Sequence, residues 1–575
     1  MIMAEYLSPG VYIEEFDSGP TPMQGVGTST AGFVGVAEKG PSSGVPVLVT
    51  GPADFKRKFG GYLHESDFGD YRFLAHAVNH FFINGGSRAF VMRVAPKDAA
   101  VAKAHQLKGK EGIVDIKAGN AGMWGNSIIV TFSHADGSKS PILEDLGDAK
   151  YRLKSAAGFN VGDVVSVVGT NKEQFRIVKN VTGNLVTFDK KFDGHVVDDG
   201  LLPKILLNTC EMNVVVEFDG ELEKYEGVTF NVSSPSFIEK AMSKSEIVNL
   251  TAKPCENAVD PMDVIRQVFG GKGDSIKVSL SGGVTGTAAT LTDDDFIGKD
   301  EGPGSRSGIQ AFLDNTEVSI MAVPGVVSPN VQLSLVAHCE KLASRFAVLD
   351  MPMMSRTVTD VIKHRDIVDS DYCAMYHPWL QVFDPLDKKD TFIPPSGSMM
   401  GIYARSDNQR GVHKAPANEV VANCTGLFVN YNVTEQDLLN PKGVNLIRKF
   451  PGAGIRVWGA RTASSKPLWK YINVRRLFIY LEESIKINTN WVVFEPNEAG
   501  LWTRVRRTIE LFLEGVWRTG ALVGSSTAEA FFVDIGPNTM TKDDIDNGRL
   551  ICVIGVAPVK PAEFVIFRIT QKTGE

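Results

Sequence analysis

Long apolar runs are absent from this chain of 575 residues, and none approaches the roughly 20 residues that a helix needs to cross a bilayer. The first residues, MIMAEYLSPGVYIEE, contain no basic stretch followed by an apolar core, so we expect no secretory signal. The six cysteines are widely separated and no pair has C-x-x-C spacing, which argues against a zinc site. A net charge of −7 argues against a general nucleic-acid binder.

Catalytic motifs are missing as well. The sequence contains no G-x-S-x-G elbow and no G-x-x-x-x-G-K-[ST] phosphate loop. His76 and His80 have the spacing of metalloprotease ligands, but Ala77 replaces the glutamate, which favours a histidine pair on a helix surface. His364-Arg365-Asp366 copies the start of a kinase catalytic loop without its asparagine, and Asp293 to Asp295 lack the spacing of a calcium loop. We therefore expect no catalytic residue, no metal site and no cofactor.

Size and glycine content indicate several domains with many turns. A chain of this length exceeds a single core, and glycine accounts for 56 residues scattered along it. Residues 1–20 are typical of an arm: Val11 to Phe16 form one short β-prone run with no neighbouring hairpin partner. Such a strand is not stable alone, so it must join a sheet elsewhere.

Residues 21–97 are predicted to be α/β. Ala31 to Val36 and Ala89 to Val94 have the composition of buried strands, and Phe73 to Ile83 forms an amphipathic helix that ends at Asn84-Gly85-Gly86. Residues 98–316 change character, since turn residues separate short strands over 127–132, 164–168, 175–178, 185–188, 213–218 and 276–280. We expect small inserted β domains there, dispensable for the core, with an exposed loop over 292–308 that tolerates an insertion near Gly302.

Strands and helices alternate again from residue 317. The division predicted is an α/β domain over 317–460 and a further one over 461–575. Strands are predicted over 318–323, 347–349, 372–379, 455–458 and 491–494, with helices over 330–346, 359–368, 473–487 and 498–519. Three β runs follow, over 530–535, 549–556 and 563–570, and no helix remains to cover the last of them.

Segments at both ends of the chain resemble contractile tail sheath proteins of the bacteriophage myovirus type, which are related to the sheaths of contractile injection systems. The N-terminal segments are YLSPGVYIEE (6–15), GVGTSTAGFVG (25–35) and FFINGG (81–86) followed by VMRV (91–94). The C-terminal segments are NVRRL (473–477), WVVFEPN (491–497), LW (501–502), GAL (520–522), and NGRL (547–550) through PAEF (561–564). The order of these segments and their place at both ends carry the resemblance, which covers roughly 1–97 and 318–575.

The resemblance implies a discontinuous α/β sheath core, one part subtilisin-like in topology, with inserted β domains and extended terminal arms. It implies a structural protein of the virion tail, assembled in the host cytoplasm, and not an enzyme. Six-subunit rings would stack helically around an inner tail tube, and contraction would drive the tube through the cell envelope for genome ejection. The implied partners are further copies of the chain, the tube protein, the baseplate and the tail terminator, without direct contact to nucleic acid or membrane.

Two terminal strands are predicted to pass between subunits. Their residues are Val11, Tyr12, Ile13, Glu14 and Glu15 at one end and Phe564, Val565, Ile566, Phe567, Arg568 and Ile569 at the other. Both are β-prone and unprotected, and an added strand gains backbone hydrogen bonds of about 1 kcal/mol each. Two alternatives stay open: the sheath of a non-viral injection system, and an α/β hydrolase-like enzyme with a convergent Ser/His/Asp set.

The helix over 498–519 predicts a tube contact. Trp502, Val505, Ile509, Phe512, Leu513 and Val516 recur at helical spacing and would form its buried face. Arg504, Arg507 and Arg518 then lie together on the opposite side, whereas Arg506 lies nearer the buried edge. These three arginines either touch an acidic tube surface or form a solvated basic face partly neutralised by Glu510 and Glu514.

Overall fold

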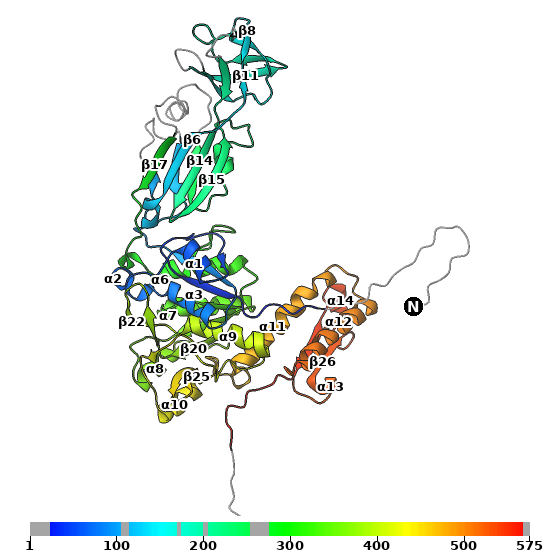
Figure 1. The fold of residues 1–575 in the computed structure, drawn as a ribbon. Coiled ribbons are helices and arrows are strands. Elements are labelled where there is room, and N and C mark those ends of the chain that lie inside the picture. The colour runs from blue at the N-terminus through cyan, green and yellow to red at the C-terminus, as the bar shows by residue number, and fades with distance from the viewer. Residues whose placement is uncertain are drawn as a thin grey trace, which may run out of the picture.

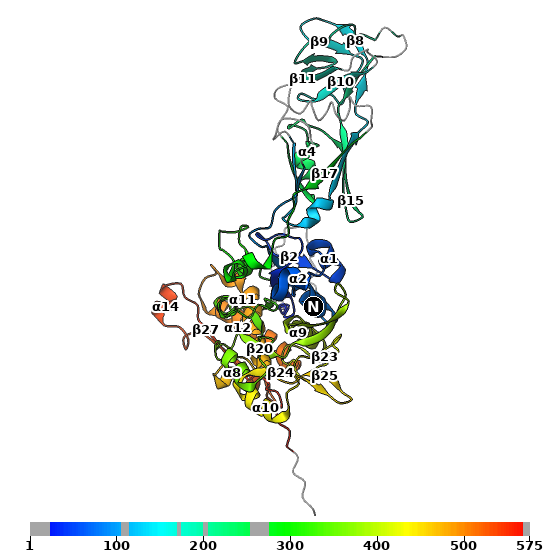
Figure 2. The same ribbon diagram turned by 90° about the vertical axis from the view of Figure 1, so that its left-hand side faces the viewer.

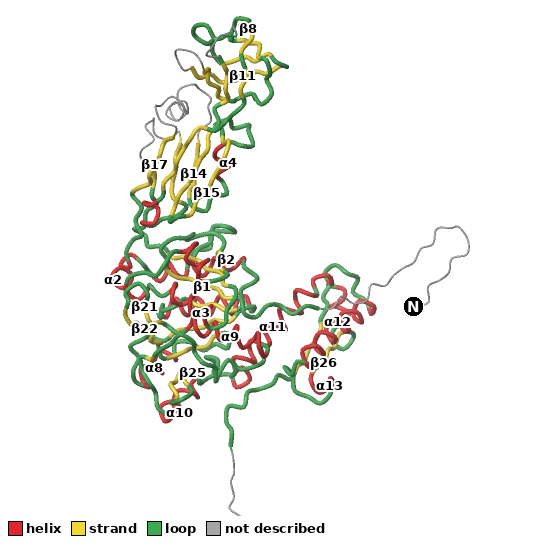
Figure 3. Tube along the Cα trace, in the orientation of Figure 1, coloured by secondary structure: helices red, strands yellow, loops and turns green. Residues whose placement is uncertain are grey.

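The computed structural model describes residues 23–104, 114–168, 174–198, 200, 205–252 and 275–566. Its parts are an α/β body, two β modules stacked end to end on one side of the body, and a C-terminal domain reached through a long helix (Figure 1). The view turned by 90° shows the same stacking (Figure 2). Helices gather in the body and the C-terminal domain, whereas the stacked modules consist mainly of strands and the loops that join them (Figure 3).

The body is built on an eight-stranded sheet of order β2-β3-β1-β18-β19-β20-β24-β25. Its inner pairs are parallel, and the edge strands β2 and β25 are antiparallel to their neighbours. Pairing of β1 with β18 joins segments nearly 300 residues apart, which confirms a core assembled from separate parts of the chain. The strands are β1 (Ala31–Val36), β2 (Val47–Val49), β3 (Ala89–Val94), β18 (Ile320–Ala322), β19 (Phe346–Asp350), β20 (Cys373–His377), β24 (Val444–Phe450) and β25 (Gly454–Val457).

Helices cover both faces of this sheet, as the fully buried strands require. On one face, α3 (Leu74–Ile83) lies against α9 (Ser396–Arg410), and on the other lie α7 (Pro329–Leu342) and α8 (Val358–Arg365). The two helices on the first face approach closely because α9 contributes glycines. A Cβ at Gly397 would come within 2.3 Å of the Ala77 carbonyl oxygen, and one at Gly401 within 2.4 Å of that of Phe81.

Shorter elements complete the body. A hairpin of β21 (Leu380–Asp384) and β22 (Lys389–Ile393) pairs with β23 (Gly426–Leu427). The remaining helical turns are α1 (Pro52–Phe59), α2 (Glu65–Phe68), η1 (Gly69–Tyr71), α10 (Val433–Leu439), η5 (Asn440–Lys442) and η6 (Pro467–Trp469). The helix predicted over 330–346 ends early, because Ala343 adopts a left-handed conformation (φ 55°) and Phe346 already starts β19.

Two β modules are nested in one insertion. Backbone hydrogen bonds of 2.9 and 3.0 Å between Ala100 and Val284 mark where the chain leaves and re-enters the body. The inner module contains β4 (Lys103–Ala104), β5 (Val114–Ala118), η2 (Met123–Ser127), β6 (Ile129–His134), β14 (Met212–Phe218), β15 (Glu221–Val228), α4 (Ile238–Met242), β16 (Val248–Ala252) and β17 (Ser275–Ser281). The outer module, inserted between β6 and β14, contains β7 (Lys139–Ser140), β8 (Ile142–Asp145), β9 (Lys150–Leu153), β10 (Val164–Val168), β11 (Gln174–Thr182), β12 (Leu185–Phe188) and β13 (Leu206–Thr209).

The exposed loop predicted over 292–308 is shorter than expected: residues 299–305 form a largely exposed loop, and the segments on either side of it, 288–297 and 308–314, pack on the body. These two segments form η3 (Ala288–Thr290), α6 (Asp293–Ile297) and η4 (Gly308–Asp314). A reciprocal capping box between Thr292 and Asp295 starts α6, and Phe296 is buried among residues of the body core. The acidic run Asp293 to Asp295 thus forms the first turn of a helix, where carboxylates favour the helix dipole.

The C-terminal domain contains two long helices and a two-stranded sheet. Its elements are α11 (Ile472–Asn488), η7 (Asn490–Val492), α12 (Ala499–Arg518), α13 (Thr527–Ala530), β26 (Phe531–Ile535), α14 (Lys542–Asp546) and β27 (Cys552–Val556). The strand predicted over 491–494 is wrong: this segment is a 3₁₀ turn, and Phe494 has a positive φ of 69° that ends any extended run. Of the β run predicted over 563–570, residues 563–566 form no strand and 567–570 lie outside the described residues.

Candidate assembly site

The histidine pair is buried, which corrects the expected surface position. Both faces of α3 are covered, so His76 and His80 are each only 2% exposed. His76 Nε2 lies 3.5 Å from Asp384 Oδ2, whereas His80 Nδ1 lies 3.2 Å from Ser398 Oγ. Burial lowers the pKa of each imidazole to about 4, so both are neutral near pH 7. His76 fills the core where α3 meets the β21–β22 hairpin, and His80 fills it where α3 meets α9.

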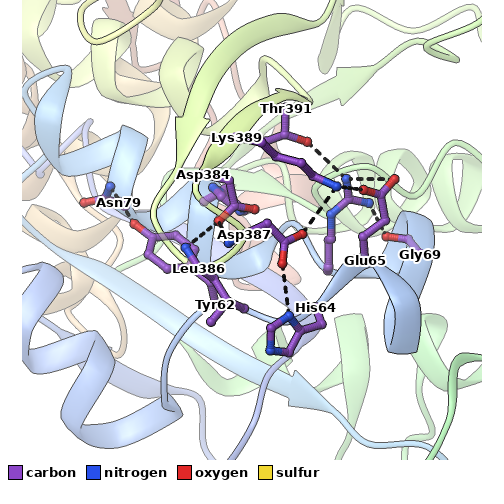
Figure 4. A network of polar contacts seen from close by, with 12 residues as sticks. Tyr62, His64, Glu65, Gly69, Asn79, Asp384, Leu386, Asp387, Lys389 and Thr391 are labelled. Atoms are coloured by element: carbon purple, nitrogen blue, oxygen red, sulfur yellow. Dashed lines mark hydrogen bonds and ion pairs between the residues drawn. The ribbon is translucent and has the colours of Figure 1, made fainter.

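The hairpin itself is fixed to the body by a polar network (Figure 4). Asp387 Oδ1 accepts a hydrogen bond of 3.0 Å from His64, and Lys389 Nζ lies 3.1 Å from Glu65 Oε2. Asp384 caps the hairpin turn by accepting from the backbone N–H of Leu386 at 2.8 Å. The network holds the hairpin against α2, although the side chains of His64, Glu65 and Lys389 are themselves about half exposed.

The other residues that resemble parts of catalytic motifs also have structural roles. Arg365 of the kinase-like triplet donates to the carbonyl oxygens of Val368, Lys442 and Ala463. Ser396, at the start of α9, donates its hydroxyl to Asp350 over 2.7 Å, and both residues are at most 2% exposed. Over the described ranges, no group of three or more His, Cys, Asp and Glu side chains could hold a metal ion. The convergent Ser/His/Asp set that a hydrolase requires does not occur among the hydrogen-bonded clusters of these residues.

Residues 24–26, which follow the predicted N-terminal arm in sequence, are bound to α11. Asn488 binds the backbone of Gln24 twice, its Oδ1 accepting from the N–H at 3.2 Å and its Nδ2 donating to the carbonyl at 2.9 Å. Ser484 Oγ accepts from Val26 N–H at 3.1 Å. A Cβ at Gly25 would lie 2.1 Å from the Tyr480 hydroxyl, so a larger residue there would have to displace the end of that side chain. The backbone of residues 24–26 is therefore fixed on α11.

A buried ion pair reinforces this attachment and joins the body to the C-terminal domain. Asp407, in the last turns of α9, lies 2.6 Å from Arg476 on α11, and the two side chains are 3% and 4% exposed. Asp407 also accepts from the Thr28 hydroxyl at 2.7 Å, and Arg476 donates to the Thr28 carbonyl at 2.8 Å. Three segments distant in sequence thus meet at one charge pair.

The β26–β27 sheet is the least complete part of the fold. Its two strands pair over five residues each, and in the described part of the chain no third strand joins either of them. One face packs on α12 through Val533 and Ile535, while Phe532 and Val553 on the other face are 58% and 45% exposed. Isolated two-stranded sheets are marginal in water, and open strand edges accept further strands.

The C-terminal arm runs from this sheet and ends in exposed apolar residues. Phe564, Val565 and Ile566 are 71%, 67% and 79% exposed. The other arm residues proposed from the sequence, Val11 to Glu15 and Phe567 to Ile569, lie outside the described residues. Three bulky side chains of this kind are costly in water, which favours their burial in a partner.

Helix α12 has the two faces that its sequence predicts. Val505, Ile509, Phe512, Leu513 and Val516 are buried, Trp502 of the predicted buried face is only partly buried, and Arg504, Arg507 and Arg518 are exposed. Arg518 pairs with Glu514 at 2.5 Å, whereas Arg504 lies 3.4 Å from Glu495 and 5.5 Å from the ring centroid of Trp491. Arg506, as expected, turns toward the sheet and donates to the Ile535 carbonyl at 2.9 Å.

Comparison with known proteins gives this arrangement a context. The family profile "Phage tail sheath protein central domain" matches residues 287–463, and the profile "Phage tail sheath C-terminal domain" matches residues 464–572 without a gap between them. The chain belongs to the phage tail sheath family. Members of this family are structural proteins, so this chain is not an enzyme. No helix among the described residues has the length and hydropathy to span a membrane.

Individual relatives extend the comparison. The tail sheath protein of Escherichia phage P2 is 25% identical over 364 residues, which cover 60% of this chain and 87% of the relative. That of Salmonella phage ViI is 27% identical over 215 residues, 32% of this chain and 33% of the relative. The sheath of an extracellular contractile injection system in its contracted state shares the fold with a TM-score of 0.53 and 20% identity, over 99% of both chains. A sheath tail protein of Listeria innocua does so with 0.52 and 11%, over 93% of this chain and 96% of the other.

Several residues that hold the terminal segments to the rest of the chain had no signal in the sequence. Asn488, Asp407 and Glu563 are ordinary surface residue types, and they gain their roles from partners 464, 379 and 102 residues away. A conserved pattern across many relatives could have marked them. The exposed arm and the two faces of α12, by contrast, follow from local composition and period.

Proposed function

We propose that this chain is the repeating subunit of a contractile tail sheath. Copies would form six-subunit rings that stack helically around an inner tail tube, and contraction would drive the tube through the host envelope for genome ejection. The baseplate and the tail terminator would bound the polymer, which forms in the host cytoplasm and becomes part of the virion tail. The observation that carries the proposal is the open two-stranded β26–β27 sheet, together with the exposed Phe564, Val565 and Ile566 that follow it in the chain.

Strand exchange explains why such an unfinished sheet is useful. A strand of five or six residues added to an open edge makes several backbone hydrogen bonds of about 1 kcal/mol each, and its apolar side chains cover the exposed face. Fixed anchors at Gln24 and at the base of the C-terminal arm let the bodies reorient while neighbours stay connected. Head-to-tail contacts of this type generate open helices.

Deletion of residues 1–19 tests this proposal. The truncated chain keeps Gln24 and its contacts, so we expect a folded monomer with an unchanged melting temperature that no longer polymerises. A chain with a short flexible insertion after Gly302 is the control, since a Cβ there meets no atom within 4 Å. Long sheaths formed by the truncated chain in electron micrographs would refute strand exchange through this arm.

We further propose that α12 faces the tube and that Arg504, Arg507 and Arg518 contact an acidic tube surface. Exposed ion pairs contribute only about 0.2–1 kcal/mol each, so many of them hold an extended sheath and still release on contraction. Trp491, whose ring centroid lies 5.5 Å from Arg504, is 41% exposed and would add apolar contact. The variant Arg504→Glu with Arg507→Glu should form sheath-only polymers but no extended sheath on tubes.

The control for this variant is Arg88→Glu with Arg152→Glu, which reverses two exposed arginines on the body and the outer module. If the α12 variant still forms extended sheath at normal yield, this helix does not attach the sheath to the tube.

We also propose that the parallel part of the body sheet, β1-β18-β19-β20-β24, has subtilisin-like topology, since buried helices cover both faces of these strands.

A non-viral injection apparatus is the alternative user of this fold. Its support is the fold match over 99% of both chains with the sheath of an extracellular contractile injection system. The curated phage relatives favour the viral function. Capsid and terminase genes beside the coding sequence would decide for a phage, and their absence from a complete gene cluster would decide for the injection apparatus.

A further inference from the structure

The C-terminal arm is held at its base by one carboxylate. Arg461 donates to both oxygens of Glu563, from Nε to Oε1 at 2.7 Å and from Nη2 to Oε2 at 2.8 Å. Asn440 Nδ2 donates to Oε1 at 2.8 Å, the Tyr471 hydroxyl donates to Oε2 at 3.0 Å, and Lys470 Nζ lies 3.5 Å from Oε2. Four side chains of the body and its junction thus converge on a single residue of the arm.

The geometry makes this a strong contact. A bidentate pair of guanidinium and carboxylate fixes direction as well as distance. The Arg461 and Glu563 side chains are 8% and 18% exposed, so water screens them less than a surface pair. Burial raises the pKa of Glu563, but the hydrogen bonds from Arg461 and Asn440 outweigh it and lower the pKa to about 2. The carboxylate is therefore charged over the whole physiological pH range.

The clamp is continuous with the central sheet. Asn445, on β24 and fully buried, holds the backbone of Arg461 on both sides, accepting from its N–H at 2.7 Å and donating to its carbonyl at 2.7 Å. Tyr471 directly precedes α11, and Glu563 follows β27 by seven residues. Both ends of the C-terminal domain are thus fastened at one point of the body, and the exposed Phe564 to Ile566 begin immediately beyond it.

We propose that Glu563 is a tether that carries tension from the C-terminal arm into the α/β body, through Arg461 and Asn445 to the eight-stranded sheet. The inference rests on the proposed function, in which the arm joins a neighbouring subunit. A pull on the arm would otherwise act on β27, one strand of a two-stranded sheet with five paired residues. With the clamp in place, the load passes to the part of the fold that has a core on both sides.

The first test uses the full-length monomer and hydrogen–deuterium exchange. Glu563→Ala should accelerate exchange in residues 557–563, where Val559 N–H is bonded to the Ala521 carbonyl, and leave β24 and β26 unchanged. Glu317→Ala, which removes the partner of Arg88 in an exposed ion pair, is the control and should change neither segment. Equal exchange of residues 557–563 in wild type and Glu563→Ala would overturn the proposal.

The second test follows contraction. Glu563→Ala subunits should assemble into extended sheaths on tubes, but the sheaths should break into fragments when a mild denaturant triggers contraction, while Glu317→Ala sheaths contract intact. Intact contraction of Glu563→Ala sheaths would overturn the tether alone. Failure of the wild-type chain to polymerise would instead overturn the proposed function, and the tether with it.

Discussion

The body sheet has eight strands with helices on both faces, whereas the C-terminal sheet has two strands and a helix on one face. The inner strands β1, β3, β18, β19 and β20 of the body are buried along their whole length, but Phe532 and Val553 of the smaller sheet are about half exposed. The body therefore completes its fold within one chain. The C-terminal domain leaves apolar surface and strand edges for another chain, which is how a subunit can be stable alone and still require neighbours.

The largest effect is expected from the body core. Phe81 is fully buried against Phe33, with ring centroids 5.7 Å apart. Phe81→Ala should lower the free energy of unfolding by about 3–5 kcal/mol, because the lost transfer energy adds to a cavity that α9 cannot close. Chemical denaturation of the monomer measures this change. A loss of unfolding free energy below about 1 kcal/mol would contradict a tightly packed body core.

The junction between the two regions comes next. Asp407→Asn leaves Arg476 buried without a negative partner, which should cost about 3 kcal/mol, at the low end of the range for breaking buried pairs. We expect the loss in thermal unfolding together with faster exchange of residues 24–28, since Thr28 binds both residues. Glu317→Gln, at an exposed pair, should cost about 0–1 kcal/mol. Similar costs for the two variants would contradict a charge-locked junction.

The Glu563 clamp predicts a pH-dependent effect. The folded-state pKa of Glu563 is lowered from 4.5 to about 2, so the carboxylate stabilises the fold above pH 4.5 and loses this contribution as the pH falls toward 2. The difference in unfolding free energy between wild type and Glu563→Gln should be full at about pH 6 and smaller at about pH 3. A difference that is constant over this range would show that Glu563 is not selectively bound as an anion.

On the C-terminal sheet the same type of substitution should have little effect on the monomer. Phe532→Ala removes a half-exposed ring from the outer face, so unfolding should change by no more than about 0.5 kcal/mol. Polymerisation should be weakened, because the face that an added strand would cover is lost. Phe81→Ala is the matched variant for this measurement, because it removes a ring from the body core. If Phe532→Ala lowers the free energy of unfolding as much as Phe81→Ala does, the two sheets do not differ in the way described.

The smallest effect on the body is expected from removal of the outer module. Ala135 N–H donates to the Glu211 carbonyl at 3.0 Å, so the chain enters and leaves this module at one place. Replacing residues 136–210 by a two-residue Asn-Gly turn would join β6 to its antiparallel neighbour β14. We expect an unchanged melting temperature of the body in calorimetry. A lowered melting temperature would show that the module supports the body.

Elements whose burial leaves a regular pattern of apolar residues in the sequence were predicted correctly. The strand predicted from the apolar run of β1 and the helix predicted from the period of α12 were both confirmed. β1 is buried along its whole length, and α12 has one buried face and one exposed face. Helix α9 was missed because it is buried on all sides, so its apolar residues have no period that distinguishes it from a core strand. The segment 491–494 has a strand's composition but is exposed, and no neighbouring strand pairs with it.

Contacts between distant residues could not be predicted. The burial of His76 and His80 depends on α9 and on the hairpin at 380–393, more than 300 residues further on. The clamp on Glu563 depends on a loop about 100 residues away. The sequence shows only that His76, His80 and Glu563 are polar, and their partners are determined by tertiary packing.

The most direct measurement is a cryo-electron microscopy map of the assembled polymer at a resolution that shows strands. The account predicts that the β26–β27 sheet gains strands from residues 9–16 and 564–570 of neighbouring subunits, with Glu563 still bound to Arg461 of its own subunit, while the eight-stranded body sheet keeps its order. A polymer in which β26–β27 remains a two-stranded sheet, with subunits joined through body surfaces alone, would contradict it.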